Sequence, residues 1–122
     1  MLRSYEAGHT NTGQAGELAE RLGTAAEPVG LDSQAKYGVL ATGGGELMLR
    51  LISSKQPDYK ECIWDQAAGS IIVEEAGGRV TDLDGNALDF ARGIRLTANR
   101  GVCASNGHVH DRVLEAIARI GA

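Results

Sequence analysis

W-D-Q-A-A-G at positions 64–69, followed by S-I-I-V-E-E-A-G-G at 70–78, has the pattern of a helix with a carboxylate at its start. Asp65 is a favourable N-cap because its side chain can accept hydrogen bonds from the first backbone N–H groups. Apolar residues then recur at helical spacing and predict one apolar face: Ala68, Ile71, Ile72 and Ala76. Gly77 stands where a helix often ends in a left-handed residue. The stretch therefore predicts a helix that begins at Asp65 and ends at Gly77.

The first turn of this helix consists of small residues, so another backbone or a ligand can come close to it. A helix N-terminus also favours negative charge, and a phosphate near it would be stabilised. On this interpretation the carboxylate of Asp65 lies in a cleft. The alternative is that Asp65 only caps the helix, which is the common use of aspartate before an apolar run. The local pattern leaves both interpretations open.

Length and composition bound the class of protein. The 122 residues are enough for one core, so a single domain over 1–122 is predicted. The net charge is −4, with no basic block to hold nucleic acid, and no apolar run approaches the ~20 residues of a membrane span. The first residues do not resemble a signal peptide. Cys62 and Cys103 lack the spacing of a metal site, so reduced thiols and a cytoplasmic location are expected.

Strand and helix patterns alternate along the chain. The strands are expected at 3–6, 29–31, 46–52 and 102–105, and the further helices at 13–22, from Asp32 to the glycines at 43–45, and at 109–120. Asp84-Gly85-Asn86 is typical of a β-hairpin between 79–82 and 87–90. This order predicts an α/β layered fold whose sheet is mixed, mostly parallel and flanked by helices.

Two polar segments near the start of the chain are candidate binding sites. His9, in the loop G-H-T-N-T at 8–12, could hold a phosphate or the edge of a base, or be a surface histidine. Ser33 and Lys36 are three residues apart at a predicted helix start, which places a hydroxyl and an ammonium on one face beside free N–H groups. Such a face forms an anion site, and the alternative is a capping serine with a solvated lysine.

Three further residues are of types that can bind an anion or a metal ion: one arginine and two histidines. Arg50 lies on an otherwise apolar face of the predicted strand 46–52, so its guanidinium either extends to solvent or meets an anion. His108 and His110 alternate just before the last predicted helix and have no third ligand nearby. We interpret these two histidines as surface residues.

The W-D-x-A-A-G and I-V-x-E-A-G-G segments resemble the second signature of the inositol monophosphatase-like, metal-dependent phosphatases. L-D-S-Q-A-K-Y at 31–37, the G-H-T-N-T loop and the L-R-L strand are similar to the 3′(2′),5′-bisphosphate nucleotidase branch, which removes the 3′-phosphate of 3′-phosphoadenosine 5′-phosphate. The resemblance implies the C-terminal, substrate-binding part of the inositol monophosphatase and sugar phosphatase fold. It also implies that Asp65 binds a catalytic Mg²⁺, and that the phosphorylated nucleotide contacts His9, Ser33, Lys36 and Arg50.

The family's first signature, D-P-[IL]-D-[GS]-T, is absent from this sequence, as is the upstream glutamate that shares the metals. In the family these residues supply most Mg²⁺ ligands and the threonine that helps to activate the attacking water. One carboxylate does not hold Mg²⁺ tightly, so two-metal catalysis cannot be built from Asp65 alone. We therefore expect no catalytic residue here, and a partner in the N-terminal, metal-binding half of the same fold.

Two rival functions remain open. An inositol-phosphate phosphatase is the first, although the L-D-S-Q-A-K-Y stretch disfavours it because a neutral ring needs no nucleotide platform. A non-catalytic nucleotide-binding or interaction module is the second.

Overall fold

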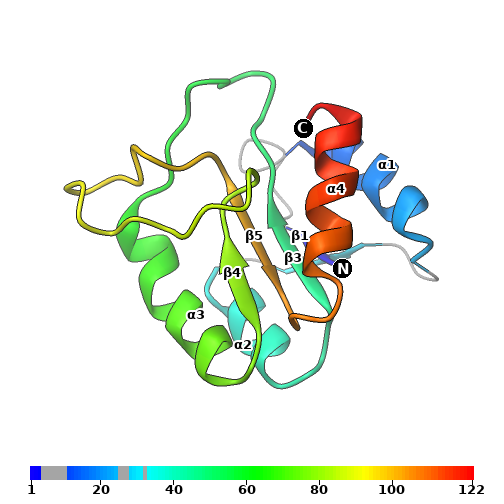
Figure 1. The fold of residues 1–122 in the computed structure, drawn as a ribbon, viewed down its shortest axis with the longest axis horizontal. Coiled ribbons are helices and arrows are strands. Elements are labelled where there is room, and N and C mark those ends of the chain that lie inside the picture. The colour runs from blue at the N-terminus through cyan, green and yellow to red at the C-terminus, as the bar shows by residue number, and fades with distance from the viewer. Residues whose placement is uncertain (4–10, 25–27, 32) are drawn as a thin grey trace.

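One mixed sheet forms the centre of the molecule (Figure 1). The computed structural model describes residues 1–3, 11–24, 28–31 and 33–122. Its strands lie in the order β2-β1-β3-β5-β4, with bounds β1 Leu2–Arg3, β2 Val29–Gly30, β3 Leu47–Arg50, β4 Arg79–Thr81 and β5 Val102–Ser105. β1 pairs in parallel with β2 and β3, whereas β5 is antiparallel to β3 and β4. The predicted α/β class and mixed sheet are confirmed, although the pairs divide evenly between the two directions.

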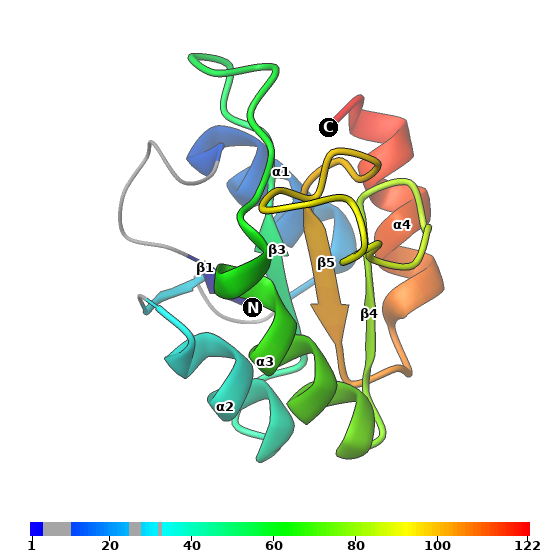
Figure 2. The ribbon, with the colours of Figure 1, turned by 90° about the vertical axis from the view of Figure 1, so that its left-hand side faces the viewer.

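Helices cover both faces of the sheet, as the two views in Figures 1 and 2 show. α1 (Thr12–Leu22) packs beside α4 (His110–Ile120), and α2 (Ala35–Ala41) packs beside α3 (Ile63–Glu75). The alternation of side chains along β3 supplies both cores. Leu47 and Leu49 are buried with α1 and α4, while Met48 is buried with α2 and α3.

The start of α3 lies earlier than the sequence predicts. Cys62 is the N-cap in extended conformation and makes no side-chain cap bond, so the prediction that Asp65 is the N-cap is wrong. The cause is a neighbouring segment: Cys62 forms a β-bridge with Arg95, and Ile63 N–H donates to the Ile94 carbonyl at 3.0 Å. This pairing fixes the chain two residues before Asp65, which then occupies the first turn.

The end of α3 is as predicted. Gly77 has a φ of 92°, and its N–H donates to the Glu74 carbonyl at 3.0 Å. Gly78 N–H donates to the Val73 carbonyl at 2.9 Å. These two bonds form a Schellman motif, which satisfies carbonyls that a helix end leaves without partners.

The buried face of α3 is not the apolar face that the sequence predicts. The buried residues are Gln66, Gly69, Ser70 and Val73. Ile71 and Ile72 remain 51% and 52% exposed. The predicted helical period is correct, but the buried face begins two residues earlier than the predicted apolar face. Two residues correspond to about 200° around the helix axis.

The predicted hairpin after β4 is also wrong. Residues 87–90 form no strand, and β4 pairs with β5 instead. Asp82 is buried, and its carboxylate accepts from the backbone N–H groups of Asp84 and Asn86 at 3.0 and 2.9 Å. Its other oxygen accepts from the Asn99 amide at 3.1 Å. These bonds hold a compact loop around one carboxylate rather than a ladder between two strands.

Candidate functional site

The starts of α2 and α3 lie side by side. Gln34, which precedes α2, donates from its side-chain amide to the carbonyl of Asp65 and, at 3.5 Å, to that of Trp64. Ser33 is next to it and has a φ of 62°, a left-handed conformation that is uncommon for residues other than glycine. The segment that carries Ser33 is therefore attached directly to the first turn that carries Asp65.

Lys36 is buried in α2, so the alternative of a solvated lysine is wrong. Its side chain is only 3% exposed, and its ammonium donates to the Ser33 carbonyl at 3.2 Å. The Ser33 hydroxyl accepts from Ala35 N–H at 3.4 Å. The helix begins at Ala35 rather than at Asp32, which lies outside the described residues.

Arg50 meets an anion, and that anion is Glu61 of the same chain. Arg50 Nε donates to Glu61 Oε1 and Nη2 donates to Oε2, each at 3.1 Å. Both side chains are largely shielded from solvent, with exposures of 13% and 4%. A bidentate pair of this kind is stronger and more rigid than a single surface contact.

Glu61 continues this contact into α2 and α3. The Gln66 amide donates to Glu61 Oε2 at 2.8 Å, and the Tyr37 hydroxyl donates to Gln66 Oε1. We call this set the Arg50–Glu61–Gln66–Tyr37 chain. It links the end of β3 to both helices that cover this face of the sheet.

Gly69 explains how Tyr37 reaches α3. A Cβ at position 69 would lie 2.1 Å from Tyr37 Cδ2, so any side chain there would overlap the ring. The small residues of W-D-Q-A-A-G predict the close approach of another backbone or a ligand, but the close neighbour at Gly69 is an aromatic side chain.

The Tyr37 hydroxyl is affected by the charges of two predicted site residues, Arg50 and Asp65, and of Glu61. Burial raises the pKa of the Tyr37 hydroxyl well above its usual value, and the negative charge of Glu61 raises it further. Arg50 opposes this shift, and Asp65 adds to it. One hydroxyl thus lies within the fields of all three charged residues, which come from β3, the loop before α3, and α3 itself.

Asp65 is exposed in the first turn of α3 rather than enclosed in a cleft by the described residues. Within the described ranges, no group of three or more His, Cys, Asp or Glu side chains is placed to hold a metal ion. One exposed carboxylate does not by itself fit a Mg²⁺ site, since this ion needs near-octahedral oxygen ligation.

The three predicted histidines have different outcomes. His9 lies outside the described residues. His108 is exposed, as predicted, but His110 is fully buried, so its interpretation as a surface residue is wrong. Its ring nitrogens lie 2.8 Å from the hydroxyls of Thr81 and Ser105, which accounts for its burial between the sheet and α4.

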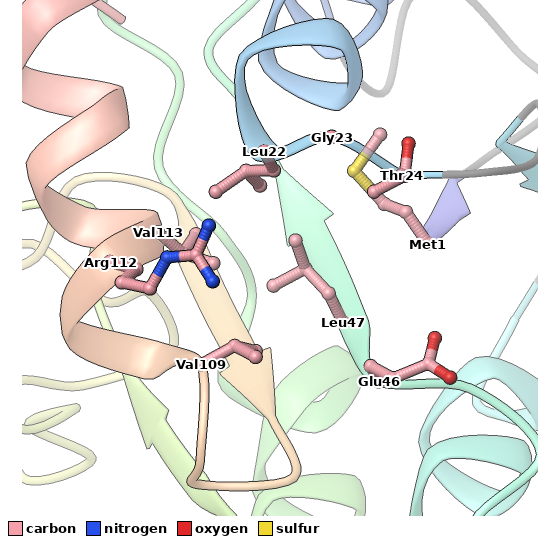
Figure 3. Close-up of a pocket in the computed structure, with 9 residues that line it drawn as sticks. All are labelled: Met1, Leu22, Gly23, Thr24, Glu46, Leu47, Val109, Arg112 and Val113. Carbon is pink, nitrogen blue, oxygen red and sulfur yellow. The ribbon is translucent and has the colours of Figure 1, made fainter.

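A pocket of about 360 Å³ lies on the other face of the sheet (Figure 3). Its lining comes from α1, α4 and β3 and includes Leu22, Leu47, Val113 and Arg112. Of the predicted site residues that the structure describes, none lines this pocket, and we do not assign the candidate site to it.

The sequence predicts Ser33, Lys36, Arg50 and Asp65 as site residues but does not indicate the residues that link Arg50 to α2 and α3. Glu61 follows a polar loop, and Gln66 and Tyr37 lie in helices whose buried faces the hydrophobic pattern did not identify. The only feature of the sequence that could have indicated Glu61 is Arg50, because a buried arginine needs an anionic partner.

The fold is shared with solved inositol monophosphatases. An enzyme of this type from Thermotoga maritima superimposes with a TM-score of 0.65 at 24% identity, over 98% of this chain and 40% of that one. The inositol monophosphatase of Anabaena gives a TM-score of 0.62 at 24% identity, over 97% of this chain and 42% of the other. These structures define the class of fold.

The chain belongs to the inositol monophosphatase family, whose sequence profile matches residues 3–122. It is 48% identical over 120 residues to a 3′(2′),5′-bisphosphate nucleotidase of Emericella nidulans, covering 98% of this chain and 34% of that protein. The corresponding protein of Oryza sativa is 48% identical over 117 residues, with 96% and 32% covered. The chain thus spans about a third of the length of these curated relatives.

The described part of the molecule contains no helix with both the length and the apolar character needed to cross a bilayer.

Proposed function

We propose that this chain is the substrate-binding portion of a Mg²⁺-dependent phosphatase that converts 3′-phosphoadenosine 5′-phosphate to AMP and phosphate. The similarity to proteins named 3′(2′),5′-bisphosphate nucleotidase, at 45–48% identity over nearly the whole chain, carries this proposal. Ser33 and Lys36 at the start of α2 lie beside the first turn of α3, which carries Asp65, and this arrangement supports the proposal. Arg50, at the end of β3, is linked to both helices through Glu61 and Gln66. His9 is proposed as a further substrate contact.

The chain's own residues would bind and orient the nucleotide. Lys36 and Arg50 supply two cationic groups for a substrate with two phosphates, and Arg50 can form charge-assisted bonds with a phosphate oxygen. Asp65 would contribute one oxygen ligand to Mg²⁺. Because Asp65 alone does not fit a complete site, we derive no catalytic step from these residues.

The remaining ligands would come from an N-terminal portion that carries the D-P-x-D-x-T signature. The outer face of α3 supports such a partner, because Trp64, Ile71 and Ile72 are each more than half exposed. Ala68 lies between them and is exposed as well. Apolar side chains in one helical stripe are typical of a surface that another part of a protein covers.

Arg50→Ala tests the nucleotide assignment in an enzyme completed by such a portion. The variant should weaken the binding of 3′-phosphoadenosine 5′-phosphate much more than that of inositol phosphate, because each lost charge-assisted bond is worth roughly 1.5–3 kcal/mol. Inhibition and turnover measurements with both substrates give the ratio of the losses for the two substrates. Arg92→Ala, which removes an exposed arginine paired with Asp89, is the matched control. Equal losses on both substrates would refute the nucleotide assignment.

A second candidate is nucleotide binding without catalysis by this chain alone. It is favoured by the lack of a three-ligand metal cluster among the described residues.

A further inference from the structure

The Arg50–Glu61–Gln66–Tyr37 chain contains a buried carboxylate to which the phosphatase chemistry gives no role. Glu61 is 4% exposed, and burying a carboxylate is costly unless it is paired and hydrogen-bonded. Two Arg50 donors and one Gln66 donor meet that need. The same bonds restrict where the Arg50 guanidinium can point.

The position of Glu61 allows it to control several site residues together. It follows the loop after β3 and immediately precedes the N-cap of α3. Its bond with Gln66 joins it to the first turns of α3, where Asp65 lies. The bond from Tyr37 to Gln66 extends this connection to α2, next to Lys36. A shift of Glu61 would therefore change the distances among three residues that the proposed function uses.

We propose that Glu61 is a positioning residue that orients Arg50 for the second phosphate of the substrate, with Gln66 and Tyr37 holding Glu61 in place. This inference rests on the proposed function, in which Arg50 binds a nucleotide phosphate. Glu61 itself does not touch the substrate. Its carboxylate fixes the Nε and Nη2 edge of the guanidinium, so that an incoming phosphate meets a donor group of defined orientation.

Removing the negative charge of Glu61 distinguishes a positioning role from simple competition between Glu61 and phosphate for Arg50. If Glu61 only competed with phosphate for Arg50, Glu61→Gln would tighten phosphate binding, since it removes a nearby like charge. If Glu61 positions Arg50, Glu61→Gln should weaken phosphate binding. Glu61→Asp keeps the charge but shortens the side chain by one methylene, and should weaken phosphate binding as well.

The experiment measures dissociation constants of 3′-phosphoadenosine 5′-phosphate and adenosine 3′-phosphate, which lacks only the second phosphate, by NMR titration of the 122-residue chain. The ratio of the two constants isolates the second phosphate and is insensitive to a general loss of folded protein. We expect the wild-type chain to prefer the bisphosphate, and Glu61→Gln to reduce that preference about tenfold, as for the loss of one charge-assisted bond. Glu75→Gln makes the same charge change on an exposed residue of α3 and should leave the ratio unchanged.

One further variant keeps the test decisive if Glu61→Gln is poorly folded. Tyr37→Phe keeps the ring against Gly69 but removes the hydroxyl that holds Gln66, so it should reduce the ratio by a smaller factor. In the Arg50→Ala background, Glu61→Gln should change the ratio no further, because its effect acts through Arg50.

The outcomes distinguish the two proposals. A wild-type chain without preference for the bisphosphate overturns the proposed function, and with it this role for Glu61. A wild-type preference that Glu61→Gln preserves or increases overturns the positioning role alone. Equal weakening of both nucleotides assigns Glu61 a structural role and also overturns it.

Discussion

His110 is the single residue whose burial has the clearest consequence for pH dependence. The Thr81 hydroxyl donates to the Asp82 carbonyl at 2.8 Å, so it accepts from His110 Nε2–H. His110 Nδ1 then accepts from the Ser105 hydroxyl. This arrangement needs the neutral imidazole, because a protonated ring has no acceptor nitrogen. Burial, and after it the positive charge of Arg79, lowers the pKa of His110, although Asp111 partly opposes the shift.

We expect the chain to lose stability as the pH falls below about 6.5, the ordinary pKa of an unfolded histidine. The folded pKa is lowered, so the contribution of neutral His110 is complete above that pH and is lost as the pH falls through the folded pKa. Thermal unfolding between pH 8 and pH 5 measures the effect, with both pH values chosen to bracket about 6.5. His110→Gln should flatten this dependence, whereas His108→Gln at the exposed neighbour should keep it. Identical pH profiles for the two variants would contradict the assignment.

Among the elements, α2 and α3 depend on a glycine at their contact. Gly69 lies under the Tyr37 ring, while Gly38 of α2 has open space where its Cβ would be. The same substitution should therefore have opposite effects. Gly69→Ala should destabilise by about 1–3 kcal/mol through overpacking, and Gly38→Ala should stabilise by up to about 1 kcal/mol through helix propensity.

Urea unfolding of the two variants against the wild-type chain provides the measurement. If Gly69→Ala were as stable as Gly38→Ala, the close contact between the Tyr37 ring and α3 would be wrong. Loss of the Gln66–Tyr37 bond in Gly69→Ala should also reduce any preference for the bisphosphate nucleotide.

Elements that depend on local chemistry could be predicted from the sequence. The caps of α1 are an example, because Asn11 accepts from Gln14 N–H at 3.1 Å and Gly23 has a φ of 67°. The alternation of β3 and the end of α3 at Gly77 are two more. In each case the deciding residues are close in sequence, so their pattern contains the answer.

Features that depend on distant partners could not be predicted. The buried face of α3 is selected by Tyr37 and Glu61, which place polar Gln66 and small Gly69 inward and leave Ile71 and Ile72 outside. The start of α3 depends on Ile94 and Arg95, about thirty residues later. The sequence leaves open whether Arg50 extends to solvent or meets an anion, and Glu61 could not be chosen among 16 acidic residues without the fold.

For the molecule as a whole, we predict that the 122-residue chain is catalytically silent. From the resemblance to the family's second signature, Asp65 is the only residue of the sequence expected to bind a metal ion, and the described residues hold no three-ligand metal cluster. A phosphate-release assay with 3′-phosphoadenosine 5′-phosphate and millimolar Mg²⁺ should therefore give no turnover above background. Weak nucleotide binding through Ser33, Lys36, Arg50 and His9 can persist without turnover.

Turnover near about 1 s⁻¹ that disappears in Asp65→Ala would contradict this prediction, since it would require further ligands within the chain. Addition of an N-terminal portion that carries D-P-x-D-x-T should restore activity. Asp58→Ala, at an exposed carboxylate of the loop before α3, serves as the control for the loss of one negative charge.

The exposed Trp64 gives this molecule a built-in optical probe. It is the only tryptophan in the sequence, is 61% exposed, and lies one residue before Asp65. Its indole emission should be that of a hydrated ring in the chain alone, and should shift to shorter wavelength when another portion of a nucleotidase covers the outer face of α3. Because Tyr37 and Gly69 lie on the opposite side of the helix, substitutions there should leave the starting spectrum unchanged. Assembly at the start of α3 can thus be followed in a fluorimeter without a label, separately from catalysis.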